Sequence, residues 1–124
     1  MSVELRGVVV GHGGLGGALV AAAEEITGIR GVLVAVSNSG ADRETLENRV
    51  VDAVGDHSAI VFVDMPSGSC MIAAMRKVSA RDDIKVVTGV NLVMLLEFLF
   101  HRTEPIAEAA KRAAESGAKS IAQR

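Results

Sequence analysis

A glycine-flanked histidine follows a short run of valines near the start of the chain. His12 lies between Gly11 and Gly13, directly after Val8–Val10. The valine run is typical of a strand buried on both faces, and from Leu15 onward apolar residues recur at helical spacing. The imidazole is therefore expected at the carboxyl edge of a parallel sheet, where open α/β sheets gather ligands and reactive groups. This location favours a functional role over a capping or core histidine in a turn, while the local pattern alone names no chemistry.

An aspartate follows a second apolar run. Asp64 comes directly after Ala59–Val63, and Pro66–Ser69 then turn the chain into the next helical pattern. In a parallel sheet whose first and third strands are neighbours, Asp64 would lie beside His12. A carboxylate beside the imidazole Nδ1–H fixes the tautomer and supports positive charge on the ring. The alternative is that Asp64 only caps the loop that follows it.

The turn after Asp64 carries further candidates. Ser69 is expected to be the N-cap of a helix that begins at Cys70, and the free N–H groups at that helix start also favour an anion. A helix start favours a lowered thiol pKa for the cysteine, although a lone cysteine more often packs as a small residue.

No spacing of His, Cys, Asp or Glu predicts a metal site. His57 is expected in a solvated loop, and His101 as a cation at a helix end.

The glycines after the first strand formally match a dinucleotide-binding fingerprint. Gly11–Gly16 has the GxGxxG spacing between a strand and a helix. The acidic residue that should end the second strand is missing from Val34–Ser39. The glycines are therefore expected to serve the turn and a phosphoryl group rather than a dinucleotide, and no cofactor is predicted.

Composition argues against several classes of protein. A formal net charge of -2 and an aromatic content of 2% give no footprint for nucleic acid. A lone cysteine cannot build a disulfide framework. Met1–Arg6 lacks a signal-peptide pattern, and the longest apolar stretch, Leu92–Phe100, is interrupted by Glu97 and is too short to span a membrane. A cytoplasmic protein is expected.

Strand-like and helical patterns alternate along the 124 residues. Strands are predicted at Gly7–Val10, Val32–Val36, Ala59–Val63 and Lys85–Thr88. Helices are predicted at Leu15–Thr27, Ala41–Val54, Cys70–Val78, Leu92–His101 and Pro105–Ser116. Gly117 is expected to end the last helix, leaving Ala118–Gln123 as a short strand. The alternation predicts one α/β domain over residues 1–124, a three-layer αβα arrangement whose four-stranded sheet is mostly parallel.

Three segments in order carry a family resemblance. They are His12 between its glycines, Val63–Asp64 before a Ser/Gly turn, and Val87–Glu97, which is close to a family stretch of the form GVN-P-ML-E. With these segments the chain resembles the IIA domain of the mannose family of the sugar phosphotransferase system over essentially its whole length. The resemblance implies that His12 is phosphorylated and that Asp64 pairs with it.

The resemblance also implies a phosphoryl relay. Neutral His12 would accept a phosphoryl group from the phosphocarrier HPr and pass it to a cysteine or histidine of a IIB component. The chain would meet the membrane only through the permease complex. Asp64 would hold the imidazole so that Nε2 is the nucleophile, and no metal or cofactor is needed. The groups expected to bind the phosphoryl oxygens are backbone N–H groups and turn residues at Gly13, Gly14, Leu15, Ser67, Gly68 and Ser69.

By the same resemblance, the C-terminal segment would take part in assembly. Glu115–Ile121 looks like the family's last segment, which adds an antiparallel strand exchanged between the subunits of a homodimer. A homodimer is therefore expected.

The chain departs from the family pattern near the proposed site. Pro66 stands in place of a bulky residue, Ser67 of a glycine, and Cys70 and Val93 of prolines. These differences bear on loop geometry and partner contacts more than on phosphorylation. Two alternatives stay open: a non-catalytic regulatory or ligand-binding domain of the same fold, and the phosphoryl-transfer subunit of dihydroxyacetone kinase, which is less similar in the Asn91 segment. The sequence does not identify a transported sugar.

Overall fold

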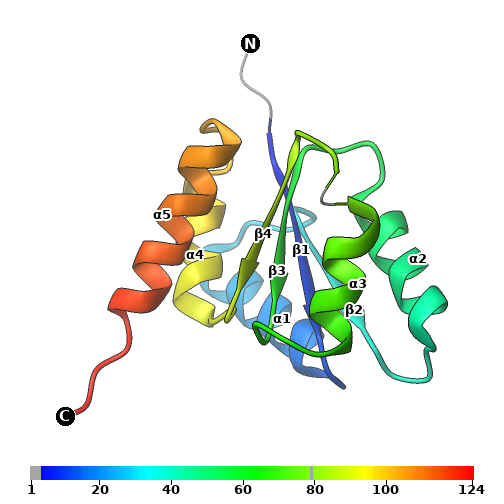
Figure 1. Ribbon diagram of the computed structural model, residues 1–124. Coiled ribbons are helices and arrows are strands. Elements are labelled where there is room, and N and C mark those ends of the chain that lie inside the picture. The colour runs from blue at the N-terminus through cyan, green and yellow to red at the C-terminus, as the bar shows by residue number, and fades with distance from the viewer. Residues whose placement is uncertain (1–3, 79) are drawn as a thin grey trace.

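A computed structural model describes residues 4–78 and 80–124 (Figure 1). The first residues of the predicted N-terminal segment, Met1–Val3, lie outside this range. The described residues form a sheet of 4 strands in the order β2-β1-β3-β4. The strands are β1 (Arg6–Gly11), β2 (Leu33–Ser37), β3 (Ala59–Val63) and β4 (Ile84–Thr88).

Every neighbouring pair in this sheet is parallel, as predicted. The first and third strands are hydrogen-bonded neighbours, and their register pairs Val10 with Val63. Both strands therefore end at the same level of the sheet. The residues that follow them, at His12 and Asp64, leave the sheet at one edge.

Helices cover both faces of the sheet, which confirms the three-layer αβα architecture. They are α1 (Leu15–Thr27), α2 (Arg43–Val54), α3 (Ser69–Val78), α4 (Leu92–Phe100) and α5 (Ile106–Lys119). Figure 1 shows α2 and α3 together on one side of the sheet and α4 and α5 together on the other. Among the described helices, none has both the length and the apolar character needed to cross a membrane.

The central strands divide the core into two apolar clusters. Along β1, Val8 and Val10 point to the cluster formed with α2 and α3, and Val9 points to the cluster that contains α4 and α5. All three valines are completely buried, so the valine run is a strand covered on both faces, as its composition predicts. In the second cluster the rings of Phe62 and Phe98 pack edge to face with centroids 5.3 Å apart.

Helices α2 and α3 begin at other residues than predicted, because the residues that cap them differ from the expected ones. Asp42 precedes α2 in extended conformation and accepts a hydrogen bond from the Thr45 N–H at 2.8 Å, so α2 begins after Asp42 and not at Ala41. The prediction that Ser69 is an N-cap is wrong, because α3 already includes Ser69. The N–H of Ile72 donates to the carbonyl of Gly68 at 3.1 Å, which places the start of the helix one residue earlier.

The C-terminal end of the fold also differs from the prediction. Helix α5 runs through Gly117 to Lys119, residues 120–124 form no strand, and Figure 1 shows the tail running away from the sheet. A predicted strand at Ala118–Gln123 is therefore absent from the described chain. A Cβ at Gly117 would lie 2.9 Å from Met94 Cε, so this glycine permits close packing of α5 on α4 and does not end the helix.

Asn91 joins the same two helices. Its side chain accepts the Met94 N–H at 3.0 Å as the N-cap of α4 and donates to the Gly117 carbonyl at 3.1 Å. The segment that carries the most specific part of the family resemblance thus has a structural role in this chain.

A pair of adjacent glycines in α1 provides a test of how this helix packs on the sheet. A Cβ added to Gly16 would lie 2.9 Å from the Val9 carbonyl oxygen, whereas a Cβ added to Gly17 meets nothing within 4 Å. We expect Gly16→Ala to lower the free energy of unfolding by about 1–3 kcal/mol, because backbone must move. Gly17→Ala should instead raise it by about 0.5–1 kcal/mol, since an exposed helical glycine costs backbone entropy. Urea unfolding of both variants checks the prediction, and equal effects of the same sign would contradict it.

Candidate functional site

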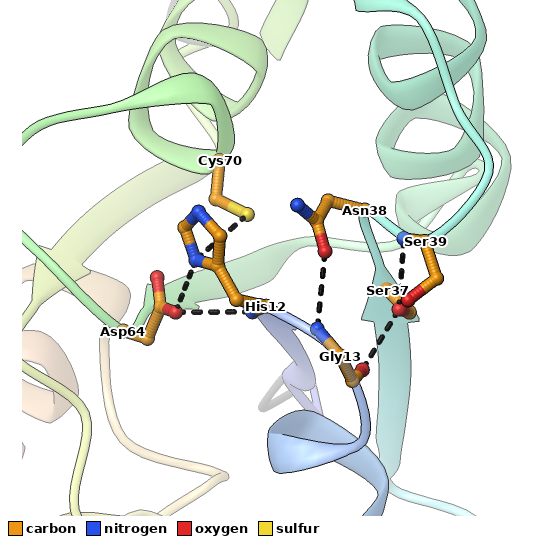
Figure 2. A network of polar contacts seen from close by, with 7 residues as sticks. All are labelled: His12, Gly13, Ser37, Asn38, Ser39, Asp64 and Cys70. Atoms are coloured by element: carbon orange, nitrogen blue, oxygen red, sulfur yellow. Dashed lines mark hydrogen bonds and ion pairs between the residues drawn. The ribbon is translucent and has the colours of Figure 1, made fainter.

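His12 lies in the turn between β1 and α1, where the chain changes from strand to helix. Its side chain is 43% exposed, and Figure 2 shows the ring directed toward Asp64 and Cys70. The next residue, Gly13, has φ of 58°, a conformation that L side chains rarely adopt. The strand-to-helix reversal therefore depends on glycine directly after the histidine, and it leaves the imidazole at the rim of the sheet.

Asp64 holds His12 by two contacts. Its Oδ2 lies 2.7 Å from the imidazole Nδ1 and accepts the backbone N–H of His12 at 3.0 Å. The Asp64 N–H in turn donates to the Val10 carbonyl at 3.1 Å, which continues the β1–β3 pairing beyond the strands. The predicted adjacency of His12 and Asp64 is confirmed, and the carboxylate is bonded to the histidine rather than serving only as a loop cap.

The electrostatics of this pair favour a charged carboxylate. Burial of the Asp64 side chain, which is only 7% exposed, raises the pKa of its carboxyl. Hydrogen bonds from the His12 ring and backbone N–H outweigh burial, so the pKa lies below its usual value. An ionised carboxylate can only accept, so the proton on a neutral imidazole is at Nδ1 and the lone pair is at Nε2.

Cys70 completes the immediate surroundings of the ring. Its Sγ lies 3.7 Å from the imidazole Nδ1, and the cysteine is completely buried at the start of α3. Burial, and secondly the charge of Asp64, raise the pKa of the Cys70 thiol. Cys70 therefore packs as a small buried residue, as expected. The alternative of a lowered pKa at the helix start is wrong, because desolvation and a nearby negative charge both oppose the thiolate.

The loop after β2 supports the histidine turn from its other side. The Gly13 N–H donates to Asn38 Oδ1 at 3.0 Å, and the Gly13 carbonyl accepts from Ser37 Oγ at 2.8 Å (Figure 2). Sequence reasoning missed both side chains. The signal was available, since β2 neighbours β1 and the register places Ser37 opposite Gly11.

These contacts limit which of the predicted N–H groups could meet an oxyanion. The Gly13 N–H is bonded to Asn38, and the Leu15 N–H donates to the His12 carbonyl at 3.2 Å. In the part of the chain that the structure describes, the Gly14 N–H has no such partner. Gly14 precedes α1 as its N-cap residue, so its N–H group is located at the positive end of the helix dipole.

The turn between Asp64 and α3 borders the same edge. Ser67, Gly68 and Ser69 are all exposed, and Gly68 has φ of 95°. Within the described residues, neither serine hydroxyl is bonded to His12 or Asp64. The turn therefore lies next to the pair without being part of its hydrogen-bond network.

The remaining histidines lie away from this site. His101 is the C-cap of α4 and is bonded to Glu97 at 3.1 Å and Glu104 at 2.6 Å. His57 is exposed just before β3 begins, at the opposite edge of the sheet. His12 is thus the histidine that the described fold places beside a buried carboxylate at the carboxyl edge.

The fold also assembles a set of metal-ligand side chains that spacing in the sequence did not predict. One ligand atom each from His12, Asp64 and Cys70 lies within 4.8 Å of the others. The prediction of no metal site rested on sequence spacing, and these residues come together only through the tertiary structure.

Comparison with known proteins yields a family and a set of similar folds. A family described as "PTS system fructose IIA component" matches residues 7–115. The phosphotransferase system component EIIA from Streptococcus agalactiae has a TM-score of 0.88 at 22% identity, covering 96% of this chain and 96% of that chain. The mannose/sorbose specific IIA subunit from Enterococcus faecalis has a TM-score of 0.85 at 18% identity, covering 98% and 95%.

A further solved structure has a similar fold. The sigma-54 interaction domain protein from Enterococcus faecalis has a TM-score of 0.73 at 15% identity, covering 97% of this chain and 95% of that chain. No curated protein sequence matches the chain.

Proposed function

The chain belongs to the family of IIA components of the sugar phosphotransferase system, and from that premise we propose that it carries a phosphoryl group on His12. The observation that supports this role best is the 2.7 Å contact between His12 Nδ1 and Asp64 Oδ2 on a ring that is 43% exposed. The contact occupies Nδ1 and leaves the lone pair of Nε2 for a phosphoryl donor.

The proposed transfer forms one P–N bond and breaks another. His12 Nε2 attacks the phosphorus carried by a phosphohistidine of HPr, and the donor nitrogen leaves with the bonding electron pair. The His12 ring becomes positively charged, and the Asp64 carboxylate stabilises that charge through Nδ1–H. A nucleophile of a IIB component then attacks the same phosphorus and returns His12 to its neutral form. The proposal places this exchange in the cytoplasm.

The phosphoryl oxygens need donors around Nε2. We assign this role to the Gly14 N–H at the start of α1 and to the exposed turn Ser67–Ser69. The Gly13 N–H, which donates to Asn38, would have to exchange that partner to contribute. Asn38 and Ser37 are proposed to position the turn rather than to bind the phosphoryl group.

The test is incubation with HPr, its kinase and phosphoenolpyruvate. A carrier gains one phosphate that is labile in acid and stable in base, and omission of HPr abolishes the gain. The second candidate is a regulatory domain, favoured by the shared fold of the sigma-54 interaction domain protein and by Pro66, Ser67 and Cys70 beside the site. A protein that stays unphosphorylated while HPr is fully phosphorylated supports that candidate instead.

We also propose that the chain forms a homodimer by exchanging its C-terminal tail. Residues 120–124 are exposed, Ile121 is 78% exposed, and β4 is an edge strand with an unpaired side. A tail that pairs with the partner's sheet would cover that apolar side chain and that edge.

Sedimentation of the intact chain and of a chain shortened after the last residue of α5 tests the dimer. We expect the intact protein to sediment as a dimer at micromolar concentration and a chain ending at Lys119 to sediment as a monomer. Ile121→Ser, which keeps the length of the tail, should weaken the dimer because it removes buried apolar surface. A monomeric intact protein, or a dimer unaffected by the truncation, contradicts tail exchange.

A further inference from the structure

The Cys70 thiol lies against the imidazole but has no part in the proposed phosphoryl transfer. Its Sγ is 3.7 Å from His12 Nδ1, the same nitrogen that lies 2.7 Å from Asp64 Oδ2. Figure 2 shows the sulfur and the carboxylate on either side of this nitrogen. A carboxylate and a thiol thus lie close to the same imidazole nitrogen, and all three groups are ligand types that proteins use for zinc.

A tetrahedral metal site requires these side chains to rearrange around the ion. Zinc bonds of about 2.0–2.3 Å place neighbouring tetrahedral ligands about 3.3–3.7 Å apart. The observed separation of Nδ1 and Sγ, 3.7 Å, is at the upper end of this range, whereas the limit of 4.8 Å that encloses all three ligand atoms is longer. The Nδ1–Oδ2 contact has to widen, which a metal ion inserted in place of the hydrogen-bond proton would cause.

A second observation points to a missing ligand at this place. Asp64 Oδ1 is buried and has no partner of standard hydrogen-bond geometry among the described residues, on a side chain that is only 7% exposed, although the backbone N–H of Met65 contributes to lowering the pKa of this carboxyl. A buried carboxylate oxygen without a partner is costly. A cation bound by the Asp64 carboxylate would satisfy this oxygen directly or through the charge that it brings.

We propose that His12, Asp64 and Cys70 bind one zinc-like divalent cation, and that the bound cation and phosphorylation of His12 exclude each other. Binding releases the thiol proton to solvent and moves the ring proton from Nδ1 to Nε2, with no electron transfer. The protonated Nε2 then has no lone pair with which to attack phosphorus. Conversely, a phosphoryl group on Nε2 keeps the proton on Nδ1 and removes the metal ligand. The exclusion rests on the proposed function, whereas the metal site itself does not.

Binding of the metal alone is the first measurement. Chelator-treated protein titrated with Co²⁺ should develop a thiolate-to-metal charge-transfer band at one equivalent, and Zn²⁺ should abolish the band. Calorimetry should show that Cys70→Ala and His12→Ala each weaken Zn²⁺ binding. The loss should exceed roughly 10–100-fold, which is the loss in affinity when a residue that only supports a metal ligand is removed. His57→Ala and His101→Ala are matched controls that keep full affinity. Mg²⁺ should not bind, because a thiolate selects softer cations.

The outcomes separate this inference from the proposed function. Zinc affinity unchanged in folded Cys70→Ala, or lost only in His101→Ala, overturns the metal site. In the phosphorylation mixture, Zn²⁺ should slow the wild type and leave the rate of Cys70→Ala independent of Zn²⁺. If Zn²⁺ slows both proteins equally, it acts on HPr or its kinase, and the proposal that bound metal prevents phosphorylation of His12 is wrong. If neither protein accepts phosphate even without Zn²⁺, the proposed function fails while the calorimetric result still decides the metal site.

Discussion

His12→Ala should take up no phosphate from phosphorylated HPr, and the loss should be complete rather than partial. The variant removes the exposed ring whose Nδ1 is bonded to Asp64 at the carboxyl edge of the sheet. The fold should persist, because the ring is 43% exposed and lies outside both apolar clusters. Loss of the partner of Asp64 should lower the free energy of unfolding by about 1–3 kcal/mol.

Matched variants make this result specific. His57→Ala and His101→Ala should accept phosphate at the rate of the wild type, and His12→Gln, which retains a polar side chain, should accept none. Mass spectrometry of the phosphorylated wild type should locate the phosphate on the peptide that contains His12. Phosphate on a peptide that contains His57 or His101 would show that the assignment is wrong.

Asp64→Asn should slow phosphoryl transfer by about 10²–10⁴-fold, which corresponds to about 3–5 kcal/mol of transition-state stabilisation. The amide is nearly isosteric with the carboxylate but carries no charge to support the imidazolium. Its NH₂ group can donate to Nδ1, and the ring proton would then move to Nε2, the wrong tautomer for attack. The rate of transfer from excess phosphorylated HPr gives the measurement.

A tautomer measurement separates this role from a structural one. Nitrogen-15 NMR of the imidazole should show the Nδ1–H form in the wild type and the Nε2–H form in Asp64→Asn. Asp56→Asn, a change in an exposed loop, should alter neither the tautomer nor the rate. An unchanged rate in Asp64→Asn would mean that the carboxylate only supports the loop.

The sequence was informative where the pattern of one segment, with an expected sheet order, was enough. The apolar runs ending at Val10 and Val63 predicted two buried parallel strands. A sheet in which the first and third strands are neighbours was expected to place Asp64 beside His12, and the observed pairing has that order. The glycines after Val10 predicted the strand-to-helix turn, which has a positive φ at Gly13. The histidine–aspartate pair could therefore be predicted before any coordinates were known.

The features that the sequence did not predict depend on how separate segments pair and pack in the folded chain. The contacts of Asn38 and Ser37 with the histidine turn follow from the pairing of β1 with β2, and nothing in the segment Val34–Ser39 by itself indicates them. The contact of Cys70 with His12 depends on the direction in which α3 leaves the sheet edge. Gly117 has the residue type of a helix end, but the packing of α5 on Met94 requires a small residue there.

The pairing of β1 with β3 has a consequence for the time course of folding. His12 and Asp64 are separated by 52 positions, and the intervening β2 does not lie between their strands. The imidazole therefore gains its carboxylate only after β3 inserts beside β1, a non-local step that closes a long loop. During synthesis, a nascent chain that has emerged only as far as β2 already contains the histidine but not its partner. Competence for phosphoryl transfer should thus appear only after β3 has paired with β1, as a marker that the two central strands have joined.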